Sequence, residues 1–435
     1  MRINDIIIKK RDGGVLTKAE IEFFVNGYTA GEIPDYQASA LLMAIYFQGM
    51  NKEETYQLTA AMRDSGDVAD LSAIVGIKVD KHSTGGVGDK TTLIVAPLAA
   101  ACGVPVAKMS GRGLGFTGGT VDKMESIPGF KTSLEEQEFF RLVNENGLSV
   151  IGQTGHIAPA DKKLYALRDV TGTIENLSLI TASIMSKKLA SGSDAIVLDV
   201  KCGDGAFMET ADKAEQLGSM MTEIGNADGK KTIAVITDME QPLGKAVGNS
   251  LEVIEAIETL KGNGPEDITE LSLELAGMMI YAGGKADTPE QGRAMAKEAL
   301  NDGAGLEKMK HFIKGQGGDA GVIDDYSLFG SAAYEEPVFA ENDGYICRLH
   351  AKQVGLASQH AGAGRASKED EIDMTAGIYL EKKTGDAVKA GDKLATVYGN
   401  DKEKVRAAAA ELAKAYVIGD DRPERHDLIH KVIGL

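Results

Sequence analysis

The chain has 435 residues, enough for roughly two to four domains of ordinary size. Hydrophobic residues make up 43% and charged residues 26%, which is typical of a folded globular protein and excludes a largely disordered chain. Lysine and arginine number 47 against 65 acidic residues, and the net charge of −18 argues against nucleic acid as a partner. A site for an anionic substrate would therefore need a local cluster of lysine or arginine side chains to offset the negative potential of the whole protein.

Other features of the composition bear on location. No apolar run reaches the ~18 residues that a membrane-spanning helix needs, so no membrane partner is expected. The charged start, MRINDIIIKKRDGG, predicts no export signal. Three scattered cysteines without a CxxC pair fit a reducing compartment, so we expect a cytoplasmic protein.

The first 66 residues predict a small bundle of helices. Thr17 and Glu20 form a capping-box pattern before an amphipathic stretch. Asp35 begins a second predicted helix, and Asn51 with Glu54 begins a third. Short connections between such helices are typical of a bundle.

From about residue 77 the pattern changes to apolar strands that alternate with helices. The predicted strands are 77–80, 104–109, 148–153, 194–201 and 232–238. Such alternation indicates an α/β fold with a mostly parallel or mixed sheet. Ligands of these sheets bind at the carboxyl ends of the strands, where two glycine-rich loops of this chain lie.

Two further segments complete the predicted organisation. Residues 161–192 contain two consecutive helices that we expect to rejoin the N-terminal bundle. The C-terminal segment resembles the hairpins of biotinyl and lipoyl barrels, without a clear setting for a cofactor-bearing lysine, and is interpreted as structural. The prediction is a discontinuous helical domain, an α/β domain, and a C-terminal α+β domain with barrel-sandwich-like hairpins: 1–66 with 161–192, 67–160 with 193–336, and 337–435.

The first glycine loop reads KHSTGGVGDKTT and runs from Lys81 to Thr92 between a predicted strand and a predicted helix. Glycines let backbone N–H groups approach an anion, and a helix N-terminus adds positive potential. Asp89 stands where a Walker A loop has glycine, so this loop is not one. A plain tight turn is the alternative, but a turn needs neither the hydroxyls nor Lys81. His82 lies in the loop, which favours a catalytic role over a structural one.

The second glycine loop reads KMSGRGLGFTGGT, from Lys108 to Thr120, and contains a GxGxxG pattern. The acidic residue that a dinucleotide site needs about 20 positions later is missing at a strand end. The lysine, arginine and hydroxyl side chains of this loop suit phosphate better.

Arg168, Ser183 and Lys187 form a third candidate group. Ser183 and Lys187 are four positions apart, so they share one face of a predicted helix. Guanidinium, hydroxyl and ammonium groups can together bind a planar heterocycle with ring carbonyls. Taken alone, a solvated helix face is the simpler interpretation.

Together these motifs resemble the thymidine phosphorylase and pyrimidine-nucleoside phosphorylase family. KHSTGGVGDK, KMSGRGLG, PADKKLYALRDVTGT, SIMSKK and DMEQPLGKAVGNSLEV are all similar to its motifs, and the likeness spans essentially the whole chain. The resemblance implies reversible phosphorolysis of a pyrimidine nucleoside such as uridine, thymidine or deoxyuridine, giving free base and α-(deoxy)ribose 1-phosphate. Lys108 before Met-Ser resembles the broad-specificity pyrimidine branch.

The resemblance also implies roles for individual residues. The implied phosphate ligands are Lys81, Ser83, Thr92, Lys108, Ser110 and Thr120. The implied base ligands are Arg168, Ser183 and Lys187, with His82 near the 2-carbonyl and His82, Arg168 and Lys187 as the catalytic residues. A monovalent cation, usually potassium, would be bound by the carbonyls of Gly88, Lys90, Leu243 and Ala246 and the carboxylate of Glu255. Family members are homodimers that associate through the helical domain.

Phe116 departs from the family pattern, which has histidine in GHTGGT. In the family this histidine is associated with closure of the cleft between domains, where the substrates are expected to bind. Phenylalanine cannot form that hydrogen bond. We therefore expect either weaker closure or a hydrophobic latch in its place, and Phe116→His should then raise kcat.

Three alternatives remain at this stage. An anthranilate-type phosphoribosyltransferase would share the architecture but needs acidic ligands for magnesium pyrophosphate, and no clear Asp-Glu pair stands at the corresponding strand end. A catalytically weakened nucleoside-binding protein is favoured only by Phe116. A dinucleotide oxidoreductase is the most distant.

Overall fold

The computed structural model describes residues 1–113, 115–153, 155–365 and 370–435. They form two compact units, each built from separate stretches of chain. The first unit comprises Met1–Ala73, Gln153–Ile196 and Ser219–Thr232, and the second comprises Ile74–Gly152, Val197–Gly218 and Ile233–Leu435. The predicted boundaries at 66/67 and 336/337 stay a prediction.

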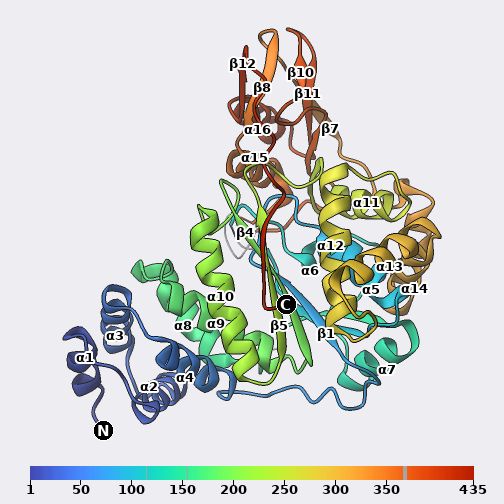
Figure 1. Cartoon of the computed structure of the whole chain (residues 1–435). Helices are drawn as coiled ribbons and strands as arrows, with labels where there is room; N and C mark the ends of the chain where they lie inside the picture. Colours follow the sequence, from blue (N-terminus) through green and yellow to red (C-terminus); the bar gives the residue numbers. More distant parts are fainter. Residues whose placement is uncertain (114, 154, 366–369) are drawn as a thin grey trace. The chain divides into compact units, whose positions relative to one another are not determined.

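The first unit is helical, and its N-terminal helices are blue in Figure 1. Its helices are α1 (Ile3–Arg11), α2 (Lys18–Ala30), α3 (Asp35–Gln48), α4 (Lys52–Arg63), α8 (Pro159–Thr171) and α9 (Leu177–Ala190), with the second half of α10 (Ala211–Ala227). Both predicted capping boxes form, at Thr17 with Glu20 and at Asn51 with Glu54. Helix α8 packs on α2 and α3, and α9 packs on α4, so one apolar core joins the two sequence segments.

The second unit contains most of the central strands, and β4 and β5 each begin with two residues of the first unit. A four-stranded sheet has the order β1 (Val79–Ser83), β4 (Ala195–Cys202), β5 (Lys231–Asp238) and β13 (Ile429–Ile433). Strand β2 (Val106–Ser110) pairs in parallel with β3 (Leu148–Gly152), and β13 is antiparallel to β5. Every residue of β4 is buried, although the strand carries two charged side chains. Helices of this unit are α5 (Thr91–Ala101), α6 (Thr120–Glu125), α7 (Glu136–Asn146), α11 (Asn249–Leu260), α12 (Glu266–Ala282), α13 (Pro289–Asn301) and α14 (Ala304–Gly315), with short turns η1 (Ala320–Ile323) and η2 (Tyr326–Phe329).

The C-terminal segment, orange to red in Figure 1, is rich in hairpins. One sheet has the order β6 (Ala246–Gly248), β9 (Gly377–Leu380), β11 (Lys393–Gly399) and β7 (Tyr334–Phe339), and a second has β10 (Ala387–Val388), β8 (Gly344–Leu349) and β12 (Tyr416–Gly419). Helices α15 (Ala351–Ser358), η3 (Gln359–Ala363) and α16 (Lys402–Ala413) accompany these sheets. The predicted α/β class, with a helical N-terminal part and a hairpin-rich C-terminal part, is confirmed. Within the described ranges, no helix is both long and apolar enough to cross a bilayer.

Candidate active site

The first glycine loop connects the end of β1 to the start of α5, as predicted. The Ser83 hydroxyl accepts a hydrogen bond from the Gly85 N–H at 3.1 Å. The Asp89 carboxylate accepts bonds from the Thr91 N–H at 3.2 Å and the Thr91 hydroxyl at 2.6 Å. These local bonds fix the loop and place Thr92 in the first turn of α5, where helix N–H groups attract an anion.

Three buried lysines lie at the same end of the central strands. Lys81 is 2% exposed, and its Nζ donates to the Thr91 hydroxyl and lies 3.2 Å from Asp199 Oδ2. Lys201 Nζ lies 2.9 Å from the same Asp199 oxygen. Lys108 Nζ donates to the Lys81 carbonyl and lies 3.3 Å from Asp80 Oδ1. The structure thus brings the predicted phosphate lysines, Lys81 and Lys108, into one network held by aspartates.

Two members of this network, Asp89 and Lys201, keep their charges although they are buried. Burial disfavours the charged form of Asp89, but Lys81, Lys201 and Lys123 hold the pKa of its carboxyl well below the usual range. Burial likewise acts against the Lys201 ammonium, but Asp199 and Asp89 raise its pKa. Lys81, Lys108 and Lys201 are each paired with an aspartate. Their role with phosphate stays a prediction.

These aspartates were not among the predicted site residues, although the sequence of β4 contains a signal for them. Asp199 and Lys201 are charged residues within the apolar strand sequence DAIVLDVK, and both are 0% exposed. Charged side chains in a buried strand need paired partners, so such residues indicate a site or a network. Asp89 had been noted only as a departure from the Walker A pattern.

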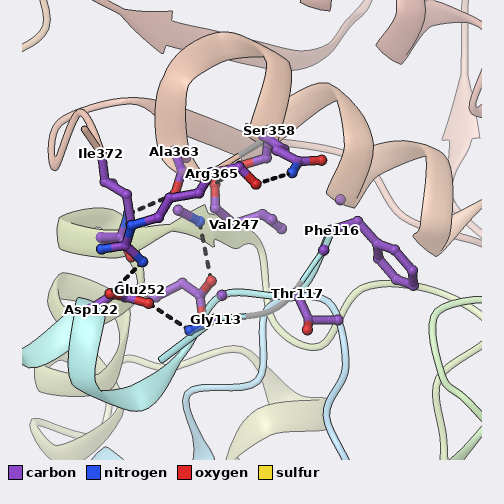
Figure 2. Close-up of a pocket in the computed structure, with 17 residues that line it drawn as sticks. Gly113, Phe116, Thr117, Asp122, Val247, Glu252, Ser358, Ala363, Arg365 and Ile372 are labelled. Carbon is purple, nitrogen blue, oxygen red and sulfur yellow. Dashed lines mark hydrogen bonds and ion pairs between the residues drawn. The ribbon is translucent and has the colours of Figure 1, made fainter. Parts of the chain in front are cut away.

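The second glycine loop begins after β2, which ends at Ser110, and leads to Thr120, the first residue of α6. Asp122 is 1% exposed and anchors this loop. Its carboxylate accepts a bond from the Gly113 N–H at 2.6 Å and lies 3.1 Å from Arg365 (Figure 2). The same carboxylate lies 3.0 Å from Arg112. Asp122 was not among the predicted site residues, and Leu114 of this motif lies outside the described residues.

Phe116 lies at the edge of a cavity lined by this loop, by the start of α11 and by the C-terminal segment. In Figure 2 its ring points away from Asp122 and Arg365. The ring packs on the C-terminal apolar core that includes Val87, and a Cβ on Gly355 of α15 would lie 3.0 Å from it. The Lys352 ammonium lies 5.8 Å from the ring centroid. All of these contacts lie within the second unit. A role of Phe116 as a hydrophobic latch stays a prediction.

Replacing Phe116 with alanine should lower the free energy of unfolding by about 2 kcal/mol, because a half-buried aromatic ring loses its contacts. Urea denaturation of the wild type and Phe116→Ala checks this. Phe116→Leu is the control and should retain most of the stability. Equal midpoints for the alanine variant and the wild type would show that the contacts of the ring do not stabilise the fold.

The base-binding candidates lie in the helical unit. Lys187 Nζ lies 3.1 Å from Ser183 Oγ, and it also donates to the buried carboxylate of Asp161 on α8. The Asp161 carboxylate thus orients the ammonium, a role that the sequence analysis did not assign. The PADKKLY motif, which contains Asp161, was the available signal.

Arg168 is 2% exposed and is engaged with the backbone. Its guanidinium donates to the carbonyls of Thr173 at 3.0 Å, Leu179 at 3.1 Å and Ile174 at 2.7 Å. Burial lowers the pKa of Arg168 to about 10, opposed by the negative charge of Asp161, so the group is charged at neutral pH. These contacts use three of its five N–H donors and hold the connection between α8 and α9. A role with the base stays a prediction.

His82 is half-buried in β1. Side chains alternate along a strand, so Lys81 and Ser83 lie on one face of β1 and His82 on the other. His82 therefore lies on the opposite face of β1 from Lys81, which is compatible with a role other than phosphate binding.

The predicted potassium ligands come together, but not as predicted. The carbonyls of Leu243 and Ala246 and the carboxylate of Glu255 surround the Lys90 ammonium. The Gly88 carbonyl accepts the Lys90 N–H at 3.0 Å, and the Lys90 carbonyl accepts the Leu93 N–H at 2.9 Å. Lys90 contributes a cation rather than a carbonyl ligand, so this donor set does not fit a potassium ion.

Family models and close relatives match this chain over most of its length. Residues 76–306 match the family described as glycosyl transferase family, a/b domain, and 4–66 match its helical bundle domain. Residues 345–419 match the pyrimidine nucleoside phosphorylase C-terminal domain. A pyrimidine-nucleoside phosphorylase of Staphylococcus haemolyticus is 57% identical over 433 residues, with 100% of both chains covered, and one of Staphylococcus aureus is 56% identical over the same length. The chain belongs to the pyrimidine-nucleoside phosphorylase family. The predicted resemblance is thereby confirmed.

A solved structure outside the pyrimidine-nucleoside phosphorylase family shares the fold. Anthranilate phosphoribosyltransferase from Thermus thermophilus aligns with a TM-score of 0.57 and 20% identity, covering 71% of this chain and 98% of that chain. This likeness supports the architecture alone. The phosphoribosyltransferase alternative therefore rests on shared fold, whereas membership of the phosphorylase family rests on identity over the full length.

Proposed function

We propose that the protein catalyses the reversible phosphorolysis of pyrimidine nucleosides to the free base and α-D-(deoxy)ribose 1-phosphate, as a pentosyltransferase of nucleoside salvage. The observation that carries the proposal is 57% identity over the whole length to a protein named pyrimidine-nucleoside phosphorylase. The buried Lys81 of β1, whose ammonium donates to the Thr91 hydroxyl at the start of α5, supports the binding of an anion there.

Inorganic phosphate is the co-substrate. Lys81 and Lys108 supply positive charge, and Ser83, Thr92, Ser110 and Thr120 supply hydroxyls at the ends of strands or starts of helices. Asp80 and Asp199 hold the two ammonium groups in place. A phosphate that takes up these donors is oriented as well as neutralised, and the positioning of both reactants can supply up to about 7–11 kcal/mol of catalysis.

The pyrimidine base is bound by Ser183, Lys187 and Arg168. When the C1′–N1 bond breaks, its electron pair goes to the base, and negative charge appears on the ring carbonyl oxygens. The Lys187 ammonium, oriented by Asp161, stabilises that charge as it develops. Phosphate oxygen forms the new bond to C1′ from the opposite face, and His82 protonates the departing base.

Other parts of the proposal rest on the family resemblance. We place the protein in the cytoplasm and expect a homodimer that associates through the helical unit. A potassium ion is left out of the mechanism, because the Lys90 ammonium lies among its expected ligands.

The first test is the release of uracil and thymine from uridine, deoxyuridine and thymidine, with and without phosphate. Phosphate-dependent release from all three is expected, given Lys108 in the position typical of the broad-specificity branch. Release from thymidine and deoxyuridine but not uridine would contradict the Lys108 argument while keeping the reaction. No release from a folded protein would contradict the reaction and favour nucleoside binding without turnover.

A further inference from the structure

The Lys90 side chain ends in a pocket of oxygen atoms supplied by other segments of the chain. Its Nζ lies 3.1 Å from the Leu243 carbonyl and 2.8 Å from the Ala246 carbonyl, and it also donates to Glu255 Oε2. Lys90 is 1% exposed and Glu255 is 6% exposed. An ammonium has three N–H donors, and these three acceptors match them one for one.

These contacts connect three segments around the phosphate loop. Lys90 directly precedes Thr91 and Thr92 at the start of α5. Leu243 lies in the connection between β5 and β6, Ala246 is the first residue of β6, and Glu255 lies on α11. The Glu255 carboxylate also accepts N–H bonds from Lys245 at 2.9 Å and Ala246 at 3.2 Å. Lys90 therefore fastens the end of the loop to a carboxylate that is itself fixed.

Two glycines allow this close approach. Gly88 has φ +74°, and a Cβ there would lie 2.5 Å from the Leu243 carbonyl. Gly244 has φ +69°, and a Cβ there would lie 2.2 Å from Glu255 Oε2 and 3.0 Å from Lys90 Nζ. No larger residue fits at either position without displacing the backbone or the ion pair, so the backbone is shaped closely around the ammonium.

A metal ion and this ammonium exclude each other. Two carbonyl oxygens and a carboxylate are suitable ligands for a hard monovalent cation, but the same oxygens already neutralise and hydrogen-bond a positive charge. We propose that the Lys90 ammonium is a built-in substitute for a monovalent metal ion, which positions the phosphate loop so that the protein needs no potassium. The kinetic part of this proposal rests on the proposed phosphorolysis.

A bound metal ion and the Lys90 ammonium differ in how they make stability depend on salt. A protein stabilised by a bound ion melts at a temperature that rises with the ion's concentration, whereas a covalently attached cation contributes at every concentration. The wild type should therefore have the same melting temperature and kcat/KM in potassium chloride and in choline chloride of equal ionic strength.

The decisive variant is Lys90→Thr, which removes the ammonium and leaves space beside the three oxygens. In choline chloride we expect a melting temperature lower by about 5 °C, because Glu255 loses its buried partner. We also expect kcat/KM for phosphate to fall by about 10²-fold as the loop loses its position. Potassium or ammonium chloride should restore most of both losses. Lys90→Met fills the space without charge and should show both losses without rescue.

Lys10→Thr is the matched control. Lys10 is 3% exposed and its Nζ donates to Glu54 at 2.7 Å, in the helical unit. Its loss should lower the melting temperature equally in both salts. A wild type whose melting temperature rises with potassium overturns the proposal, as does a folded Lys90→Thr that responds to potassium no more than Lys10→Thr does. The melting data do not depend on turnover, so they test Lys90 even if the protein shows no phosphorolysis.

Discussion

Replacing Lys187 with methionine should lower kcat/KM for uridine by about 10²–10³-fold, the usual cost of removing one group that stabilises a developing anion. Lys187 is held by Asp161 on α8 and by Ser183 on its own helix, so its ammonium is oriented before the substrate arrives. The loss should fall mainly on kcat, because the charge on the base appears only as the C1′–N1 bond breaks. Steady-state kinetics with uridine and phosphate measure both constants.

Two further variants separate this role from a structural one. Lys162→Met makes the same substitution at an exposed position of α8 and should leave kcat/KM within about twofold of the wild type. Asp161→Asn keeps Lys187 but weakens its orientation, and should lower kcat by about 10-fold. The activated substrate 5-fluorouridine has a leaving base that stabilises its own negative charge. The Lys187→Met substitution should therefore lower kcat less for 5-fluorouridine than for uridine. Equal losses for the two nucleosides would contradict a role on the departing base.

The His82→Ala variant should have kcat lowered by about 10²–10⁴-fold, the range of general acid catalysis. The KM for phosphate should change little, because strand alternation places His82 on the face of β1 opposite Lys81 and Ser83. His311→Ala, at an exposed position of α14, is the matched control and should behave as the wild type does. Wild-type turnover in His82→Ala would remove the histidine from the mechanism.

The main features of the fold could be predicted from the sequence because they depend on local patterns, namely the spacing of apolar residues and the positions of glycines. Strand β4 is a continuous buried run, and the capping boxes at Thr17 and Asn51 mark helix starts by residue type alone. The two glycine loops could be placed at strand ends for the same reason. Family resemblance then supplied roles for individual residues that spacing could not provide.

Side-chain direction could not be read in the same way. Lys90 was expected to contribute a carbonyl, and the sequence does not show that its ammonium reaches residues more than 150 positions away. Arg168 was expected to bind the base, and the sequence does not show that its guanidinium also binds carbonyls of the neighbouring turn. Asp122 and Asp161 act by orienting other side chains, and such contacts depend on tertiary packing rather than on local pattern.

The central claim is that phosphate, and not water, receives the sugar. The most direct measurement is ³¹P nuclear magnetic resonance of the wild-type protein with uridine and inorganic phosphate, alongside quantification of uracil. We expect the phosphate signal to be replaced by that of α-ribose 1-phosphate, in an amount equal to the uracil released, and the reaction to run backwards when uracil and ribose 1-phosphate are supplied. Uracil released without a sugar phosphate would show hydrolysis and contradict the account.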